Sequence, residues 1–225
     1  MKLPGNAIVK VSACGIFAEP TFKSEMVNQA LLNEEVIISD KKDNWYKIKL
    51  RYDEYSGWIH EMYLEDPNDD NAGLDKDYVS QIKNPIAFQA CQMLGKPYVW
   101  GGRSFQGYDC SGLVQTSMNL CGISFPRDAK DQAISNLLYE VELKNAHEGD
   151  LVFFEKDKVV SHVAVVISLI FDRSELLLEV VHASGSVRIS RIKFELKDLV
   201  YGTVDNNLEK EKIKLHKIMR LKEDV

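Results

Sequence analysis

The sequence has no long apolar run and no paired cysteine motif. Its longest apolar stretch, residues 163–171, is interrupted by Ser168 and is far shorter than the roughly 18 residues that a membrane span needs. The cysteines lack CxxC and Cys/His finger spacing, which argues against a structural zinc site and against a disulfide scaffold. They are Cys14, Cys91, Cys110 and Cys121. We therefore expect no metal, no other cofactor and a reducing compartment.

The sequence also has fewer basic than acidic residues. The 28 Lys and Arg residues face 34 Asp and Glu residues, giving a net charge of -6, so broad electrostatic binding to nucleic acid or to an anionic membrane is not expected. The first six residues, MKLPGN, contain no apolar stretch typical of a secretory signal. We expect a cytoplasmic protein, or a secreted one if a leader has been removed. Composition leaves the oligomeric state open.

The length of 225 residues, with 45% apolar and 28% charged residues, is typical of one large or two smaller globular domains. Up to about residue 66, β-rich runs separated by polar turns predict a small antiparallel barrel. These runs are 7–11, 35–38, 45–50 and 57–60. The polar stretch that follows has the composition of a linker. We therefore expect an all-β domain at 1–66, a linker at 67–82 and a second domain at 83–225.

The second domain begins with helical patterns and continues with strand patterns. Pro85 suits the first turn of a helix that Gly95 ends, and a second helix begins at Cys110 and ends at Gly122. Strand-like runs then occupy 150–154, 159–170, 176–183 and 186–189. This order predicts an α+β domain with helices packed on an antiparallel sheet. The charged tail 208–217 fits a helix or a last strand.

Cys110 is the strongest candidate nucleophile. At the start of a helix its thiol is exposed to the positive end of the helix dipole, which we expect to lower its pKa. The Gly-rich loop before it and the small residues Ser111 and Gly112 after it make a poor core segment. A glycine at position 112 also allows another group to approach the backbone closely. We therefore favour a reactive thiol over a buried structural one.

A thiol nucleophile needs a base, and the base needs a group that orients it. His162 and His182 each lie ten residues from Asp172, so a hairpin that turns there places them directly opposite each other. Opposed residues on one face have Cβ atoms about 4.5–5.5 Å apart, whereas a one-residue slip would separate the two rings. A single histidine is more often structural, but this pair beside a helix-start cysteine favours catalysis. A zinc site on the three residues is disfavoured because it lacks the spacing of known zinc motifs.

Six ordered motifs resemble those of the NlpC/P60 cysteine peptidases in order and spacing. They lie at 95–102, 108–114, 125–129, 149–154, 161–164 and 181–184. The first 66 residues resemble a bacterial SH3 domain through 29–32, 45–48 and 55–59. Together the two parts resemble the γ-D-glutamyl-L-diamino-acid endopeptidases that process cell-wall peptides. The match departs from the family in the long separation of the two histidines and in Ala129, where some relatives carry a polar residue.

The resemblance implies a papain-like core with Cys110 as nucleophile, His162 as general base and His182 as the residue that orients it. It also implies a substrate pocket in the second domain and an SH3-like domain that helps select a free L-Ala amine. The implied pocket residues are Tyr98, Trp100, Asp109, Ser111 and Asp128, and those of the SH3-like domain are Glu25 and Tyr55. A buried ammonium needs carboxylate partners, which suits Asp109 and Glu25.

The expected reaction is hydrolysis of the γ-D-glutamyl-diamino acid bond in a murein peptide, L-Ala-γ-D-Glu-diamino acid. Without an export signal, the expected role is recycling of imported wall peptides. Two other readings share the same residues: an inactive module that binds wall peptide, and an amidase or acyltransferase on the same fold. The choice between diaminopimelate and Lys, and the strictness of the free-amine requirement, are left open by the sequence.

Overall fold

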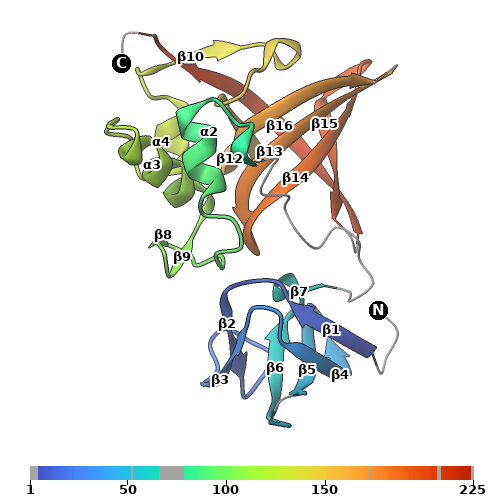
Figure 1. Cartoon of the computed structure of the whole chain (residues 1–225). Helices are drawn as coiled ribbons and strands as arrows, with labels where there is room; N and C mark the ends of the chain where they lie inside the picture. Colours follow the sequence, from blue (N-terminus) through green and yellow to red (C-terminus); the bar gives the residue numbers. More distant parts are fainter. Residues whose placement is uncertain (1–4, 52, 66–78, 173, 207–208, 224–225) are drawn as a thin grey trace. The chain divides into compact units, whose positions relative to one another are not determined.

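The computed structural model describes residues 5–51, 53–65, 79–172, 174–206 and 209–223. The chain divides into two compact units (Figure 1). The N-terminal unit comprises Met1–Leu74 with Gly95–Pro97, and the C-terminal unit comprises Asp75–Leu94 with Tyr98–Val225. Of the linker expected at 67–82, residues 67–78 lie outside the described residues.

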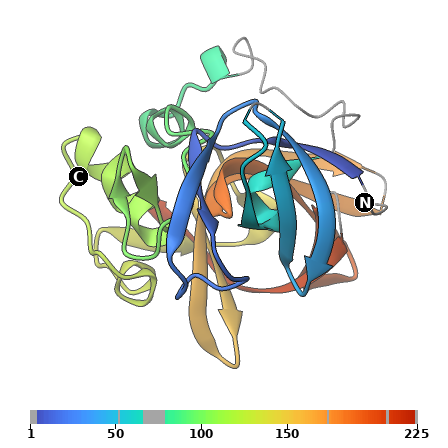
Figure 2. The same ribbon diagram turned by 90° about the horizontal axis from the view of Figure 1, so that it is seen from below.

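The N-terminal unit is a seven-stranded antiparallel sheet in the order β3-β2-β6-β5-β4-β1-β7, whose strands curve around one another in Figure 2. Its elements are β1 (Gly5–Val9), β2 (Ala13–Phe17), β3 (Met26–Leu31), β4 (Glu35–Lys42), β5 (Trp45–Leu50), β6 (Ser56–His60), η1 (Glu61–Tyr63) and β7 (Leu64–Glu65). Alternate residues such as Val36 and Ile38 point into one apolar core. The four predicted strands are present, whereas β2, β3 and β7 were not predicted.

The C-terminal unit begins with short helices, α2 (Pro85–Cys91), α3 (Cys110–Leu120) and α4 (Ala129–Ala133). Asn84 caps α2, since its side-chain oxygen accepts the backbone N–H groups of Ile86 and Ala87. Gly122 directly follows the C-cap of α3 and adopts φ of 83°, as the predicted helix end requires. The prediction that Gly95 caps the first helix is wrong, because α2 ends at Cys91 with Gln92 as its C-cap. α4 was not predicted. Within the described part of the chain, no helix is long and apolar enough to cross a membrane.

A sheet of long strands follows, in the order β10-β16-β11-β12-β13-β14-β15. The strands are β10 (Leu138–Val141), β11 (Leu151–Lys156), β12 (Val159–Asp172), β13 (Glu175–Ser184), β14 (Ser186–Glu195), β15 (Asp198–Asn206) and β16 (Glu209–Leu221). The small elements β8 (Arg103–Ser104), β9 (Gly107–Tyr108) and η2 (Leu143–Asn145) lie outside this sheet. Because β16 pairs with both β11 and β15, six strands close into a barrel and β10 extends it on the outside.

The sheet separates two apolar cores. On β11, Leu151 and Phe153 belong to the core under the helices, whereas Val152 and Phe154 belong to the core inside the barrel. Burial on both faces explains why the strand sequences are nearly continuous apolar runs. Figure 1 shows α2, α3 and α4 together on one side of this sheet.

The prediction of helices on an antiparallel sheet is therefore matched only in part, because the unit is mostly β with short helices. The sequence of the tail 208–217 fitted either a helix or a strand, and its described residues belong to β16. The tail forms a strand because β16 pairs with both β11 and β15. A helix in its place would not supply the backbone hydrogen bonds that these two strands need.

Candidate active site

Cys110 is the first residue of α3 and is half-buried. Asp109 caps the helix, because its Oδ1 accepts the backbone N–H of Gly112 at 2.7 Å. A Cβ atom at position 112 would collide with the carbonyl oxygen of Gly102. The expected close approach to the Gly112 backbone is thus confirmed, and it comes from the loop that precedes the helix.

The predicted lowering of the Cys110 pKa is wrong in direction. Burial raises the pKa of the thiol, and the negative charge of Asp109 adds to this effect. Backbone hydrogen bonds at Val163 and Ser111 act in the opposite direction without outweighing burial. The hydrogen bond at Val163 also locates the thiol, because Val163 directly follows His162 on β12. The free protein therefore holds Cys110 as a neutral thiol at neutral pH.

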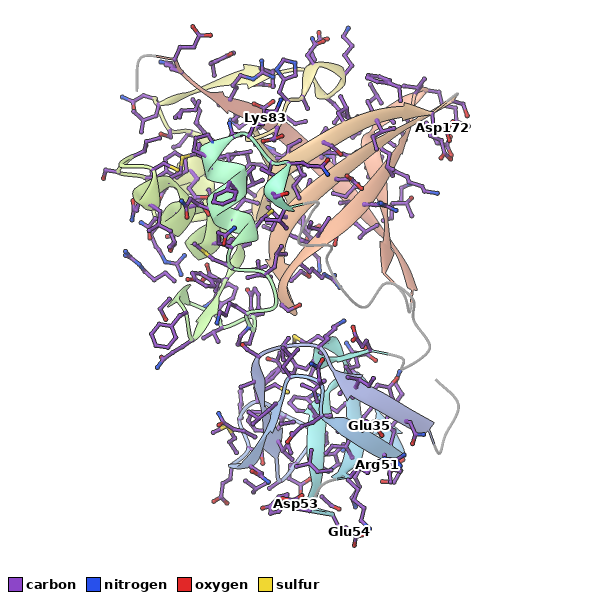
Figure 3. All side chains as sticks on the ribbon, in the orientation of Figure 1. Glu35, Arg51, Asp53, Glu54, Lys83 and Asp172 are labelled. Atoms are coloured by element: carbon purple, nitrogen blue, oxygen red, sulfur yellow. The ribbon has the colours of Figure 1, made fainter. Side chains whose placement is uncertain are left out.

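The two histidines lie on neighbouring strands but are not directly opposite, so the predicted pairing is wrong. Val165 pairs with Val181, which puts His182 opposite Ala164 and leaves His162 two residues further along the same face. The hairpin turns between Asp172 and Glu175, which pair with each other, and not at Asp172 as predicted. An irregularity between Val166 and Ser168 then shifts the register by one residue, which places both histidines on the same face. Figure 3 shows the labelled Asp172 at the far end of this hairpin.

The diagonal arrangement still brings the rings together, because aromatic side chains reach across such a step. Nε2 of His162 lies 2.7 Å from Nδ1 of His182, and the ring planes meet at 80° with centroids 5.0 Å apart. Nε2 of His182 lies 2.8 Å from Oγ of Ser190 on β14. Phe154 stacks on the other side of His162 at 6.2 Å. A hydrogen-bonded row therefore crosses β12, β13 and β14.

Both histidines are held neutral. Burial lowers the pKa of His162 to about 4, and the positive charge of Arg188 adds to the effect. Burial, His162 and Arg188 together hold the pKa of His182 well below its ordinary value. Arg188 is the cross-strand partner of His182 on β14, which explains its influence on the pair. At neutral pH the site thus contains a thiol and two neutral imidazoles.

A buried ion pair fixes the segment that carries Cys110. Asp109 forms two hydrogen bonds with Arg127, of 3.0 Å and 2.6 Å, and also accepts the backbone N–H of Gly101 at 2.8 Å. The hydroxyl of Ser111 lies 2.9 Å from Nη1 of Arg127. Asp109 and Ser111, which were both expected in the substrate pocket, therefore form hydrogen bonds with another residue of the protein. Arg127, which lies in the motif at 125–129, was not predicted as a site residue, although a buried carboxylate requires a cationic partner.

Of the other expected pocket residues, Tyr98 lies near the thiol. Burial, Cys110 and Asp109 raise the pKa of the Tyr98 phenol to about 12, so it keeps its proton. Its backbone N–H donates to the carbonyl of Gly185 at 2.9 Å, which ties its loop to the turn after β13. Trp100 is 87% exposed, and Asp128 is exposed at the start of α4 without a side-chain capping bond.

Glu25 and Tyr55 belong to the N-terminal unit. Glu25 is exposed directly before β3, and its backbone carbonyl accepts the N–H of Ala18. The phenol of Tyr55 donates to the carbonyl of Val27 at 3.1 Å and so supports β3. Their contribution to substrate selection stays a prediction. In the portion of the chain that the structure describes, no cluster of three or more His, Cys, Asp and Glu residues could hold a metal ion.

A thiol at a helix start and a hydrogen-bonded histidine pair on the adjoining sheet are the groups that a thiol hydrolase uses. Comparison with known families agrees with this class. Residues 95–200 match the model of the NlpC/P60 family, and residues 16–64 match the model of the bacterial dipeptidyl-peptidase SH3 domain. The chain therefore contains an NlpC/P60 domain preceded by a bacterial SH3 domain, and its curated relatives include proteins named as peptidases.

Among these relatives, the gamma-D-glutamyl-L-lysine dipeptidyl-peptidase of Bacillus cereus is 26% identical over 65% of this chain and 66% of its own length. The bifunctional muramidase/DL-endopeptidase CwlT of Bacillus subtilis is 37% identical over 42% of this chain and 31% of its own. The match thus spans less than two thirds of these relatives. The structure of NlpC2 from Trichomonas vaginalis is 24% identical, with a TM-score of 0.40, over 96% of this chain and 74% of that one.

Proposed function

We propose that this protein is a cysteine endopeptidase that hydrolyses the γ-D-glutamyl-diamino acid bond of murein peptides. The observation that carries the proposal is the 2.7 Å contact between His162 and His182, next to the strand residue whose backbone hydrogen-bonds Cys110. The relatives named gamma-D-glutamyl-L-lysine dipeptidyl-peptidase support the choice of bond.

The proposed mechanism uses the free nitrogen of His162. Nε2 of His162 is engaged with His182, so Nδ1 is the atom that takes the thiol proton as sulfur attacks the γ-carbonyl. The resulting imidazolium donates this proton to the leaving amine, the C–N bond breaks and a thioester forms on Cys110. Water then attacks the thioester with His162 again as base, releasing the γ-carboxylate and restoring the thiol.

The negative oxygen that forms during each attack needs donors. The backbone N–H of Cys110 is one, because it lies at the start of α3. The phenol of Tyr98 is a second, since its raised pKa keeps the O–H available and its loop is tied to the turn after β13. Two donors from different elements would hold the oxygen without reorganisation.

Selection of the substrate is assigned to both domains. A relative named dipeptidyl-peptidase releases dipeptides, which requires recognition of a free N-terminal amine. We assign this recognition to Glu25 and Tyr55, while Asp109 and Ser111 shape the pocket through their contacts with Arg127. Trp100 and Asp128 are exposed and available to a peptide. Preference for a free amine would suit recycling of wall fragments.

Mass spectrometry of L-Ala-γ-D-Glu-diaminopimelate incubated with wild type and with Cys110→Ala tests the proposal. The peptide with Lys in place of diaminopimelate and an N-acetylated copy run alongside. Release of the diamino acid by wild type alone, and only from free-amine peptides, is the expected result. Hydrolysis by Cys110→Ala would overturn the mechanism. A product that gains an added acceptor instead of water would identify an acyltransferase, and no cleavage of any peptide would identify a binding module.

A further inference from the structure

The hydrogen-bonded row that starts at His162 does not end at His182. Oγ of Ser190 lies 2.8 Å from Nε2 of His182, and both residues are 7% exposed. Ser190 pairs with Val180 in the β13–β14 ladder, so it lies one diagonal step from His182, as His182 does from His162. We propose that Ser190 is a positioning residue that fixes the tautomer of His182 and, through it, that of His162. This inference rests on the proposed function.

Two neutral arrangements of the row have equal numbers of hydrogen bonds. In the first, Nε2–H of His162 donates to Nδ1 of His182, and Nε2–H of His182 donates to Oγ of Ser190. In the second, every donor is reversed: the hydroxyl donates to His182, and Nδ1–H of His182 donates to His162. Only the first leaves Nδ1 of His162 without a proton and able to accept one from the thiol.

The charged intermediate allows the first arrangement only. When His162 becomes an imidazolium, both of its nitrogens carry protons, so Nε2–H must donate to an unprotonated Nδ1 of His182. In the second arrangement two N–H groups would face each other across 2.7 Å. The proton of His182 must therefore be on Nε2, where Ser190 accepts it. The serine thus has to act as an acceptor throughout the reaction.

Removal of the hydroxyl takes away this acceptor. In Ser190→Ala the buried Nε2–H of His182 has no partner, which is costly, and moving the proton to Nδ1 relieves the cost. That shift gives His162 the wrong tautomer for a base. We expect kcat to fall about tenfold, as for the loss of one buried hydrogen bond, with KM unchanged. Ser190→Thr keeps a hydroxyl at the same position and should restore most of the rate.

Ser168→Ala is the matched control. It removes a serine from the same sheet, whose hydroxyl donates to Glu179 at 2.6 Å and has no contact with either histidine in the hydrogen bonds described. Thermal unfolding of both variants measures their effect on stability, so a loss of activity through misfolding is recognised. We expect Ser168→Ala to keep the wild-type kcat.

The decisive readout is the ¹⁵N NMR spectrum of histidine-labelled protein, which distinguishes protonated from unprotonated ring nitrogens. The proposal predicts protonated Nε2 and bare Nδ1 for His182 in wild type and Ser190→Thr, and a shift towards Nδ1–H in Ser190→Ala. Protonated Nδ1 in wild type would overturn it, as would equal activity of Ser190→Ala and Ser168→Ala. If wild type cleaves no murein peptide, the proposed function fails, whereas the spectra still decide the role of Ser190.

Discussion

Arg127 and Asp109 form a two-point ion pair, with Nη1 3.0 Å from Oδ1 and Nη2 2.6 Å from Oδ2. The same carboxylate accepts the N–H groups of Gly101 and Gly112. One buried charge therefore connects the loop before α3, the start of α3 and the segment before α4. Because Cys110 directly follows Asp109, the position of the thiol depends on this pair.

Asp109→Asn tests this dependence. The amide keeps the shape of the carboxylate but loses its charge and part of its acceptor capacity, so Arg127 loses its partner. We expect the free energy of unfolding in urea to fall by about 3 kcal/mol, the lower end of the range for a broken buried pair, because the Arg127 side chain is 30% exposed. Asp128→Asn is the matched control, since Asp128 makes no capping bond, and it should leave stability unchanged. Equal stability of the two variants would contradict the assigned role.

The histidine pair should make stability depend on pH. The pKa of His162 is lowered from 6.5 to about 4 by burial, so between these values the unfolded chain binds a proton that the folded chain does not. Stability is therefore expected to fall as the pH decreases from 6.5 to 4. Urea unfolding at several pH values measures this slope. The double variant His162→Gln with His182→Gln should reduce this slope without abolishing it, because burial also lowers the pKa of His60. A wild-type slope in the double variant would refute the assignment.

The reactivity of Cys110 should follow that of a neutral thiol. Burial raises the pKa of Cys110, so its thiolate appears only above the ordinary value of about 8.5. Alkylation by uncharged iodoacetamide, followed by mass spectrometry of the peptide that contains Cys110, measures the thiolate without substrate. We expect slow modification at pH 6–7 and a steep rise above pH 8.5. Fast modification at pH 6 would indicate a thiolate–imidazolium pair instead.

His182→Ala should reduce activity less than Cys110→Ala. In the proposed mechanism, His182 orients His162 through the 2.7 Å contact and takes no part in bond formation, so we expect some turnover when it is absent. We expect the fold-reduction of kcat in His182→Ala to be about a hundred times smaller than that in Cys110→Ala. Steady-state hydrolysis of the diaminopimelate peptide provides the comparison. Equal losses would give His182 a direct role in the chemistry.

The closure of the barrel should depend on Arg220. Its Nε and Nη2 lie 2.8 Å and 2.9 Å from the carboxylate of Asp150, which is 2% exposed, and this pair connects β16 to the segment before β11. Arg220→Met leaves that carboxylate uncompensated, and we expect a loss of about 3 kcal/mol in urea unfolding. Lys144→Met removes the exposed pair with Glu142 and should change stability by less than about 1 kcal/mol. Similar losses in both variants would contradict this account.

The helix that carries Cys110 could be predicted from the sequence, because its signals are local. Asp109 caps it, Gly112 admits a neighbouring backbone and Gly122 follows its end at positive φ. β11, β12, β13 and β14 were also predicted, since their sequences are rich in apolar residues. β10 and β15 were not, and the tail that forms β16 was left open because its charged residues lie between apolar ones and fit either a helix or a strand.

Register and burial could not be predicted. The pairing of β12 with β13 depends on an irregularity after Val166 that no local pattern marks, so the histidines meet diagonally and Ser190 joins their row. The thiol pKa also required the tertiary structure, because burial by distant segments outweighs the helix start.

Local signals were enough to predict the helix that begins at Cys110, the two candidate histidines and the division into β-rich and mixed parts, since capping, periodicity and spacing are properties of neighbouring residues. The alignment of β12, β13 and β14, the ion pair between Asp109 and Arg127 and the closure of the barrel by β16 became visible in the folded protein alone. Strand register and ion pairing join residues far apart in the chain, and their free energies depend on burial that exists only after folding.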